Sequence, residues 1–155
     1  MQEIAILLHN VRSVHNVGSI FRTADAAGVS TVHLTGLTPA PIDRFGRIRK
    51  ELAKTALGAE RSVAWEHTRS LAVVLKKLHR DGWKIVGVEQ DKRASDYRTV
   101  RVRRKTLFVF GNEVNGLSKA ARDACDELIE IPMHGTKESL NVAVAAGVIL
   151  FQARQ

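Results

Sequence analysis

Three polar stretches, each close behind an apolar run, carry side chains that could take part in chemistry. They read "HNVRSVHNVGSIFR", "GNEVNGLS" and "PMHGTKESLN". Amides, hydroxyls, a carboxylate and a guanidinium can hold a ligand through hydrogen bonds and charge. The six histidines show no spacing typical of metal ligands, so we expect no metal. The side chains of interest are Asn16, Arg22, Glu113, Ser139 and Asn141.

The glycine-rich stretch does not match the usual phosphate-binding loops. Gly111 and Gly116 have the spacing of a P-loop, but Leu117 stands where lysine must follow. No dinucleotide fingerprint occurs elsewhere in the chain, and Glu113 disfavours contact with pyrophosphate. The stretch therefore predicts a tight loop with accessible backbone groups, followed by a helix capped by Ser118.

The first stretch leads into a helix that we expect to end at Gly28, with Asn16 as its N-cap. Gly18 lies inside this helix and weakens it by roughly 1 kcal/mol relative to alanine. It therefore predicts a close approach of another backbone or a ligand. Arg22 lies one turn further on the same side, and we favour a functional arginine there over a surface cation.

The third stretch leads into an apolar helix. Pro132 ends the preceding strand, and Ser139 and Asn141 stand at the start of the helix. Capping of the helix is an alternative role for both side chains. For Asn141 this alternative is weak, because the residue stands two residues into the expected helix. The helix is apolar nearly all round, so we expect its own sheet or a second subunit to cover it.

These stretches lie in an alternation of strands and helices that predicts one α/β domain over residues 1–155. Its parallel sheet is covered on both faces and binds ligands at the carboxyl ends of the strands. We expect strands at Glu3–Leu8, Thr31–Leu34, Val63–Glu66, Lys84–Glu89, Leu107–Phe110 and Leu128–Ile131. We expect helices near Val17–Ala27, Arg49–Leu57, Leu71–Arg80, Lys119–Ala124 and Leu140–Gln152.

The composition favours a polyanionic partner. The net charge is +8, and cations gather in two runs, "RFGRIRKELAK" and "RVRRK". A solvated face is the alternative for either run alone, but two runs in one small domain favour nucleic acid. No apolar run could span a membrane, no signal peptide begins the chain, and the single Cys125 suits a cytoplasmic protein. The candidate residues for contact with nucleic acid, which the resemblance described next identifies as RNA, are Arg44, Arg47, Arg49, Lys50, Arg101, Arg103 and Arg104.

The ordered stretches resemble the three motifs of the SpoU (TrmH-like) branch of the SPOUT RNA methyltransferases. "NVRSVHNVGSIFRTADAAG" is similar to the first motif, "FVFGNEVNGLS" to the second and "IEIPMHGTKESLNVAVAAG" to the third. The resemblance covers nearly the whole chain. It implies a Rossmann-like α/β knot with a C-terminal trefoil knot, a homodimer, and S-adenosylmethionine as cofactor.

The implied reaction is methyl transfer to a ribose 2′-hydroxyl, in tRNA as the main expectation. Ribosomal RNA is one alternative; a catalytically silent RNA-binding module and an unrelated nucleotide-binding enzyme are the others. The resemblance assigns catalysis to Asn16, Arg22, Glu113, Ser139 and Asn141, with Arg22 orienting the substrate and the proton acceptor left open. It assigns the cofactor to Val88, Glu89, Gly111, Asn112, Gly116, Ile131, Met133, Ser139 and Leu140.

Overall fold

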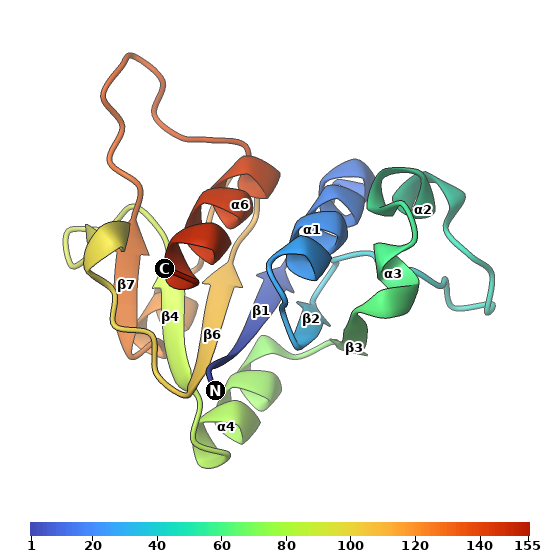
Figure 1. Ribbon diagram of the computed structural model, residues 1–155, viewed down its shortest axis with the longest axis horizontal. Coiled ribbons are helices and arrows are strands. Elements are labelled where there is room, and N and C mark those ends of the chain that lie inside the picture. Colours follow the sequence, from blue (N-terminus) through green and yellow to red (C-terminus); the bar gives the residue numbers. More distant parts are fainter.

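The computed structural model describes residues 1–155, and its seven strands form one sheet (Figure 1). The strands are β1 (Glu3–His9), β2 (Thr31–Thr35), β3 (Ala64–Thr68), β4 (Lys84–Val88), β5 (Ser95–Asp96), β6 (Lys105–Phe110) and β7 (Glu127–Glu130). Their order across the sheet is β3-β2-β1-β6-β4-β7-β5. Every neighbouring pair is parallel, which confirms the predicted α/β fold class.

Helices cover both faces of this sheet. They are α1 (Val14–Ala26), α2 (Lys50–Ala56), α3 (Ala59–Ser62), α4 (Leu71–Arg80), α5 (Lys119–Asp123) and α6 (Val142–Ala153), with a short 3₁₀ helix η1 (Tyr97–Thr99). The helices α1, α2, α3 and α6 belong to one apolar layer, and α4 and α5 belong to the other. Within the first layer, α1 and α6 pack side by side (Figure 1).

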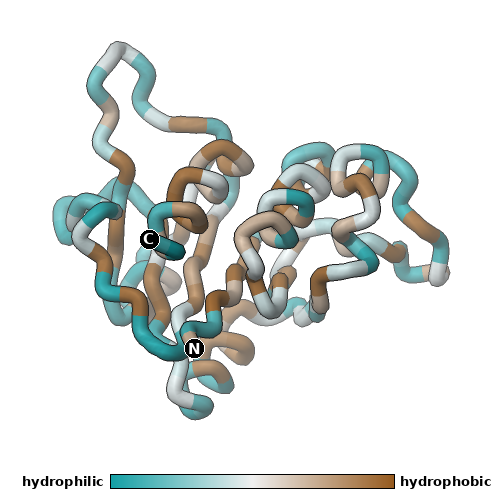
Figure 2. The backbone as a smooth tube through the Cα atoms, in the orientation of Figure 1, coloured by the Kyte–Doolittle hydropathy of each residue, from teal (hydrophilic) through white to brown (hydrophobic).

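The sheet separates the two layers because successive side chains of a strand point to opposite faces. In β1, Ile4, Ile6 and Leu8 belong to the layer of α1 and α6, whereas Ala5 and Leu7 belong to the layer of α4. All five are buried. Figure 2 shows the result, with hydrophobic strands inside and mostly hydrophilic outer loops. Burial on both faces explains why the strands read as nearly continuous apolar runs.

The six predicted strands and five predicted helices are all present, with ends shifted by a few residues. The sequence analysis missed β5, α3 and η1, which span two, four and three residues. Elements this short span only about one period of their hydrophobic pattern, which is too few residues for a repeat to be recognised.

Helix α1 begins earlier than predicted. Its N-cap is Ser13, whose Oγ accepts a hydrogen bond from the Asn16 backbone N–H at 3.1 Å. The prediction that Asn16 caps this helix was therefore wrong: the Ser13 hydroxyl is equally suited to capping and stands one turn earlier. The Asn16 side chain is left free for other contacts. Gly28 follows the helix with a φ of 71°, as predicted.

The close approach predicted at Gly18 is confirmed. A Cβ at this position would collide with Thr55 Oγ1 and with the backbone carbonyl of Leu52, so α2 crosses α1 here. The Thr55 hydroxyl also donates to the His15 carbonyl at 3.1 Å, which ties the two helices together. The glycine therefore makes room for α2 and not for a ligand.

The apolar C-terminal helix α6 is only partly covered. Its inner side packs on the sheet and α1, whereas Val144 is 53% exposed and Phe151 is 49% exposed. The resemblance implies that this C-terminal region is threaded into a trefoil knot. The order of the strands does not test threading, so the knot stays a prediction. None of the helices has both the length and the apolar character needed to cross a membrane.

Candidate functional site

A cavity of about 550 Å³ opens at the carboxyl ends of β4, β6 and β7, beneath the loop that leads to α6. Its apolar wall includes Val88, Phe110 and Ile131. No lysine, arginine or histidine lines it, whereas four glutamates do. All nine residues that the resemblance assigned to the cofactor lie in its wall: Val88, Glu89, Gly111, Asn112, Gly116, Ile131, Met133, Ser139 and Leu140.

The loop after β6 is closed by its own hydrogen bonds. Asn112 Oδ1 accepts the backbone N–H groups of Val114 at 2.8 Å and Asn115 at 3.0 Å. The Gly116 N–H donates to the Asn112 carbonyl at 2.9 Å, and Gly116 has a φ of 64°. A Cβ at Gly111 would stand 2.6 Å from the Gly116 carbonyl carbon. Both glycines are therefore required by the tight turn predicted from the sequence.

Glu89 supports this loop from the end of β4. One carboxylate oxygen, Oε2, accepts the Leu117 N–H at 2.6 Å. A Cβ on Gly116 would collide with the same carboxylate, so the glycine also admits Glu89. Glu89, which the resemblance assigns to the cofactor, therefore also holds the loop against β4.

Side-chain hydrogen bonds join the three polar stretches, which lie far apart in the sequence. Asn112 Nδ2 donates to the Asn10 carbonyl at 2.9 Å. The Glu113 carboxylate accepts the backbone N–H groups of Arg12 at 3.4 Å and Ser13 at 3.3 Å. A carboxylate there also suits the positive end of the α1 dipole. The convergence expected at the carboxyl edge of the sheet is therefore present.

The third stretch joins the first through Asn141. Its Nδ2 donates to Asn16 Oδ1 at 3.2 Å, while its Oδ1 accepts the Ala143 N–H at 2.8 Å. Asn141 is therefore the N-cap of α6, a role the sequence analysis rated as weak because it started the helix at Leu140 instead of Val142. Ser139 lies before the helix, in the cavity wall, and does not cap it.

Arg22 lies apart from the cavity. It is exposed on α1 and does not line the pocket. Asn16, which does line the pocket, stands six residues earlier in the same helix, or roughly 9 Å along its axis. Arg22 forms no salt bridge. Its guanidinium is therefore free to meet an external anion.

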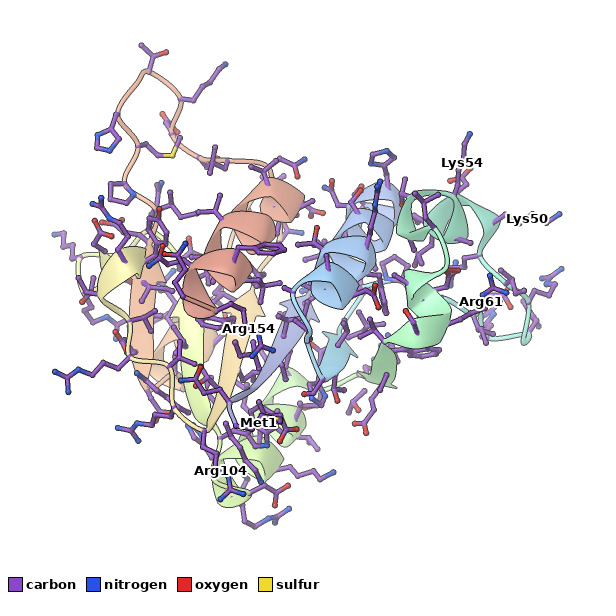
Figure 3. All side chains as sticks on the ribbon, viewed as in Figure 1. Met1, Lys50, Lys54, Arg61, Arg104 and Arg154 are labelled. Carbon is purple, nitrogen blue, oxygen red and sulfur yellow. The ribbon has the colours of Figure 1, made fainter.

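The two basic runs lie at opposite edges of the sheet. The run from Arg44 to Lys50 belongs to the connection after β2, at the carboxyl edge where the cavity opens. The run from Arg101 to Arg104 precedes β6 and so lies at the amino edge, roughly 20 Å away along that strand. Figure 3 shows Lys50 and Arg104 far apart, with Arg104 near the N-terminus. Within this chain, the second run is too far from the cavity for both to contact one nucleotide.

The sequence analysis missed Asn10, which links three loops. It has a φ of 56°, its carbonyl accepts from Asn112, and its Oδ1 accepts the Leu37 N–H at 2.8 Å. Its signal was an asparagine directly after an apolar strand, because asparagine tolerates the left-handed conformation. The neighbouring His9 contacts Thr35 Oγ1 at 2.9 Å, and partial burial lowers the pKa of His9.

The fold and the pocket define an α/β domain with a cavity at the carboxyl edge of a parallel sheet, where folds of this kind bind ligands. The chain matches the SpoU rRNA Methylase family over residues 3–151 and belongs to that family. Over 98% of its length it is 34% identical to the 23S rRNA (guanosine-2'-O-)-methyltransferase RlmB of Neisseria meningitidis and 37% identical to that of Escherichia coli. The chain spans 58% and 60% of these relatives.

Solved structures share the fold. The AdoMet-bound rRNA methyltransferase from Sinorhizobium meliloti has a TM-score of 0.89 and 30% identity, over 98% of this chain and 56% of that one. The A. aeolicus TrmH/SpoU tRNA modifying enzyme has a TM-score of 0.85 and 29% identity, over 99% and 75%. A third, which concerns "the 2-OH methylation of C/U34 on tRNA", has a TM-score of 0.83 and 27% identity, over 99% and 95%.

Proposed function

We propose that the chain, as a single SPOUT domain over residues 1–155, is an S-adenosylmethionine-dependent RNA methyltransferase that modifies a ribose 2′-hydroxyl. The observation that carries this proposal is the convergence of the three motif stretches around one cavity that has no cationic lining. Membership of the SpoU family supports it. An enzyme that matures RNA also fits the cytoplasmic location expected from the sequence.

The cavity suits S-adenosylmethionine better than a phosphorylated nucleotide. Four glutamates and no cation line it, which disfavours ATP or NAD but favours a ligand with sulfonium and ammonium charges. Val88, Phe110 and Ile131 offer an apolar wall for adenine, and the tight loop at Gly111 offers backbone groups for hydrogen bonds. When bound, S-adenosylmethionine supplies an activated methyl group.

The remaining residues then bind and orient the RNA. Arg22 is unpaired and exposed, so it can hold a substrate phosphate or ribose from outside the cavity. We assign it the role of orienting the substrate. The pair Asn16–Asn141 and the nearby Ser139 lie at the cavity mouth, where they can hold the ribose. Glu113 positions the start of α1.

A homodimer is part of the proposal. The apolar helix α6 leaves Val144 and Phe151 about half exposed, and Leu140 at the cavity is 39% exposed. A second copy packed on this face of α6 would cover those side chains. Light scattering on the purified chain should give twice the monomer mass, and Val144→Glu should shift the equilibrium toward monomer.

The comparisons favour ribosomal RNA as the substrate over the tRNA that we expected. The two curated relatives described above are named as 23S rRNA methyltransferases. A tRNA substrate remains the second candidate, because the chain covers 95% of the protein described for methylation of C/U34 on tRNA. Mapping of 2′-O-methylation in RNA from cells that lack the protein distinguishes them by which RNA loses a site. Loss of no site contradicts both.

The role of Arg22 is tested by Arg22→Ala. We expect this variant to keep its affinity for S-adenosylmethionine in calorimetry and to lose nearly all methyl transfer, because the side chain lies outside the cavity. The control is Arg80→Ala, which removes an exposed arginine from the end of α4. Equal loss of binding and transfer would contradict the assignment. Cofactor binding by the wild type without transfer to any RNA would favour the silent RNA-binding module.

A further inference from the structure

The connection between β2 and α2 folds into a small hairpin at the carboxyl edge of the sheet. Ile42 and Ile48 form an antiparallel bridge, and the Arg49 N–H donates to the Pro41 carbonyl at 2.9 Å. We call residues 42–48 the Phe45 hairpin. It lies at the outer end of the molecule, beyond α2 (Figure 1).

Asp43 shapes the turn of the Phe45 hairpin. Its Oδ1 accepts the backbone N–H groups of Phe45 at 2.8 Å and Arg47 at 2.9 Å, and its own N–H donates to the Arg47 carbonyl at 2.8 Å. These bonds lower the pKa of the Asp43 carboxyl. Gly46 supplies the φ of 78° that the turn requires. The turn is therefore built by specific contacts, which a merely flexible linker would lack.

The turn presents an aromatic ring between cations. Phe45 is 65% exposed, and the guanidinium carbons of Arg44 and Arg47 lie 4.8 and 5.0 Å from the centroid of its ring. These cation–π contacts place both guanidinium groups over the ring, which stays more than half exposed. Asp43 pairs with Arg47 at 3.3 Å, whereas Arg44 has no carboxylate partner.

The base of the hairpin is anchored to the core. Thr38 is 2% exposed; its Oγ1 accepts the Val11 N–H at 3.1 Å and donates to the Leu8 carbonyl at 2.9 Å. On the other side, α2 buries Leu52 beneath the crossing with α1. An anchored and preformed hairpin loses little conformational freedom on binding, which favours affinity for a ligand.

We propose that the Phe45 hairpin is an RNA contact in which one unpaired base of the substrate stacks on the Phe45 ring in place of a guanidinium group, while Arg44 and Arg47 turn to the flanking phosphates. This inference rests on the RNA substrate proposed above. Proteins recognise single-stranded RNA by stacking unpaired bases on aromatic rings and arginine planes within a cationic surface. The hairpin follows β2 and the cavity follows β6, and parallel strands bring both to one edge of the sheet.

The charge of the segment favours RNA over a protein partner. Residues 43–50 contain four cations and one carboxylate, and that carboxylate already accepts two hydrogen bonds within the turn. Lys50 and Lys54 extend outward from the adjoining helix α2 (Figure 3). An apolar protein surface would leave these charges without partners, whereas a phosphate backbone neutralises them.

The test uses the full chain and two RNA probes. One is a short single-stranded oligouridylate that carries one 2-aminopurine, and the other is an RNA duplex of the same length. Phe45→Ala should weaken binding of the single strand roughly 5- to 150-fold, the range for one base stacked on an aromatic ring. Phe45→Ala should leave the affinity for the duplex unchanged and should abolish the quenching of 2-aminopurine fluorescence that stacking causes. Phe45→Trp should preserve both the stacking and the affinity for the single strand.

Salt dependence separates the ring from the cations. Phe45→Ala should leave the slope of log Kd against log salt unchanged, whereas Arg44→Ala should reduce that slope by about 0.7, the value for one phosphate contact in a single strand. The matched control is Val73→Ala, which trims an apolar side chain that is 60% exposed on α4. That variant should bind both probes like the wild type.

Three results would overturn the inference. Phe45→Ala could bind the single strand with an affinity within twofold of the wild type, or it could lose as much affinity for the duplex as for the single strand. The third is a wild type that does not bind the single strand. A change of oligomeric mass in Phe45→Ala would assign the ring to a contact between two copies instead. Calorimetry with S-adenosylmethionine tests the proposed function separately, because Phe45 lies outside the cavity. A wild type that binds RNA through Phe45 but no cofactor would contradict only the methyltransferase proposal.

Discussion

Gly111→Ala is the substitution that most directly tests the loop after β6. The added Cβ would stand 2.6 Å from the Gly116 carbonyl carbon and 2.7 Å from both the Gly116 oxygen and the Leu117 nitrogen. All three are backbone atoms, so no side-chain rotation relieves the contact. Ordinary van der Waals contact begins at 3.4 Å, so the two sides of the loop must separate by roughly 0.8 Å.

That displacement acts on two hydrogen bonds made by the Gly116–Leu117 side of the loop. The bonds from Gly116 N–H to Asn112 and from Leu117 N–H to Glu89 measure 2.9 and 2.6 Å. Because misplacement by about 1 Å can cost roughly 100-fold at a site, we expect Gly111→Ala to weaken S-adenosylmethionine binding by roughly 10- to 100-fold. Overpacking should also lower the free energy of unfolding by about 1–3 kcal/mol.

The assay is calorimetric titration with S-adenosylmethionine, paired with thermal unfolding of each variant. The matched control is Gly135→Ala, because a Cβ at Gly135 meets no atom within 4 Å. We expect the control to bind and melt like the wild type. A folded Gly111→Ala chain with unchanged affinity would refute the reasoning, since a distorted loop would then have no effect on the ligand.

Two further predictions concern the fold. Gly18→Ala should lower the Tm by several degrees, because the added Cβ collides with the Leu52 carbonyl and overpacking costs about 1–3 kcal/mol. The Tm is measured by circular dichroism. An unchanged Tm would mean that α1 and α2 can separate freely. Burial lowers the pKa of His33 below its usual 6.5, so the unfolded chain takes up a proton there that the folded chain resists. The free energy of unfolding, measured in urea, should therefore be highest above pH 6.5 and should fall as the pH drops toward 5. In His33→Gln the free energy of unfolding should depend less on pH over this range.

The sequence predicted the sheet well because buried parallel strands leave a direct mark. Runs such as "IAILL" and "TLFVF" are apolar on both faces, and the structure buries them on both faces. Helix starts were harder to predict because several residues near each start can cap. Ser13 and Asn16 are both suitable caps, and only the backbone conformation decides between them.

The site was predicted as a set of residues but not as a geometry. Motif order indicated which side chains converge, whereas the contacts that join them involve backbone groups, such as the Asn10 carbonyl that Asn112 meets. No residue type marks a carbonyl as an acceptor in advance. The distance of Arg22 from the cavity and the opposite positions of the two basic runs likewise depend on the fold as a whole.

The hydrogen bonds that the Glu113 carboxylate accepts from the start of α1 couple two parts of the molecule. The same short loop lines the cavity and holds the helix that carries Arg22. Any ligand that steadies this loop also steadies the arginine, and thermodynamic reciprocity requires the converse. We therefore expect the methyl donor to raise the affinity of the protein for nucleic acid, and nucleic acid to raise its affinity for the methyl donor by the same factor.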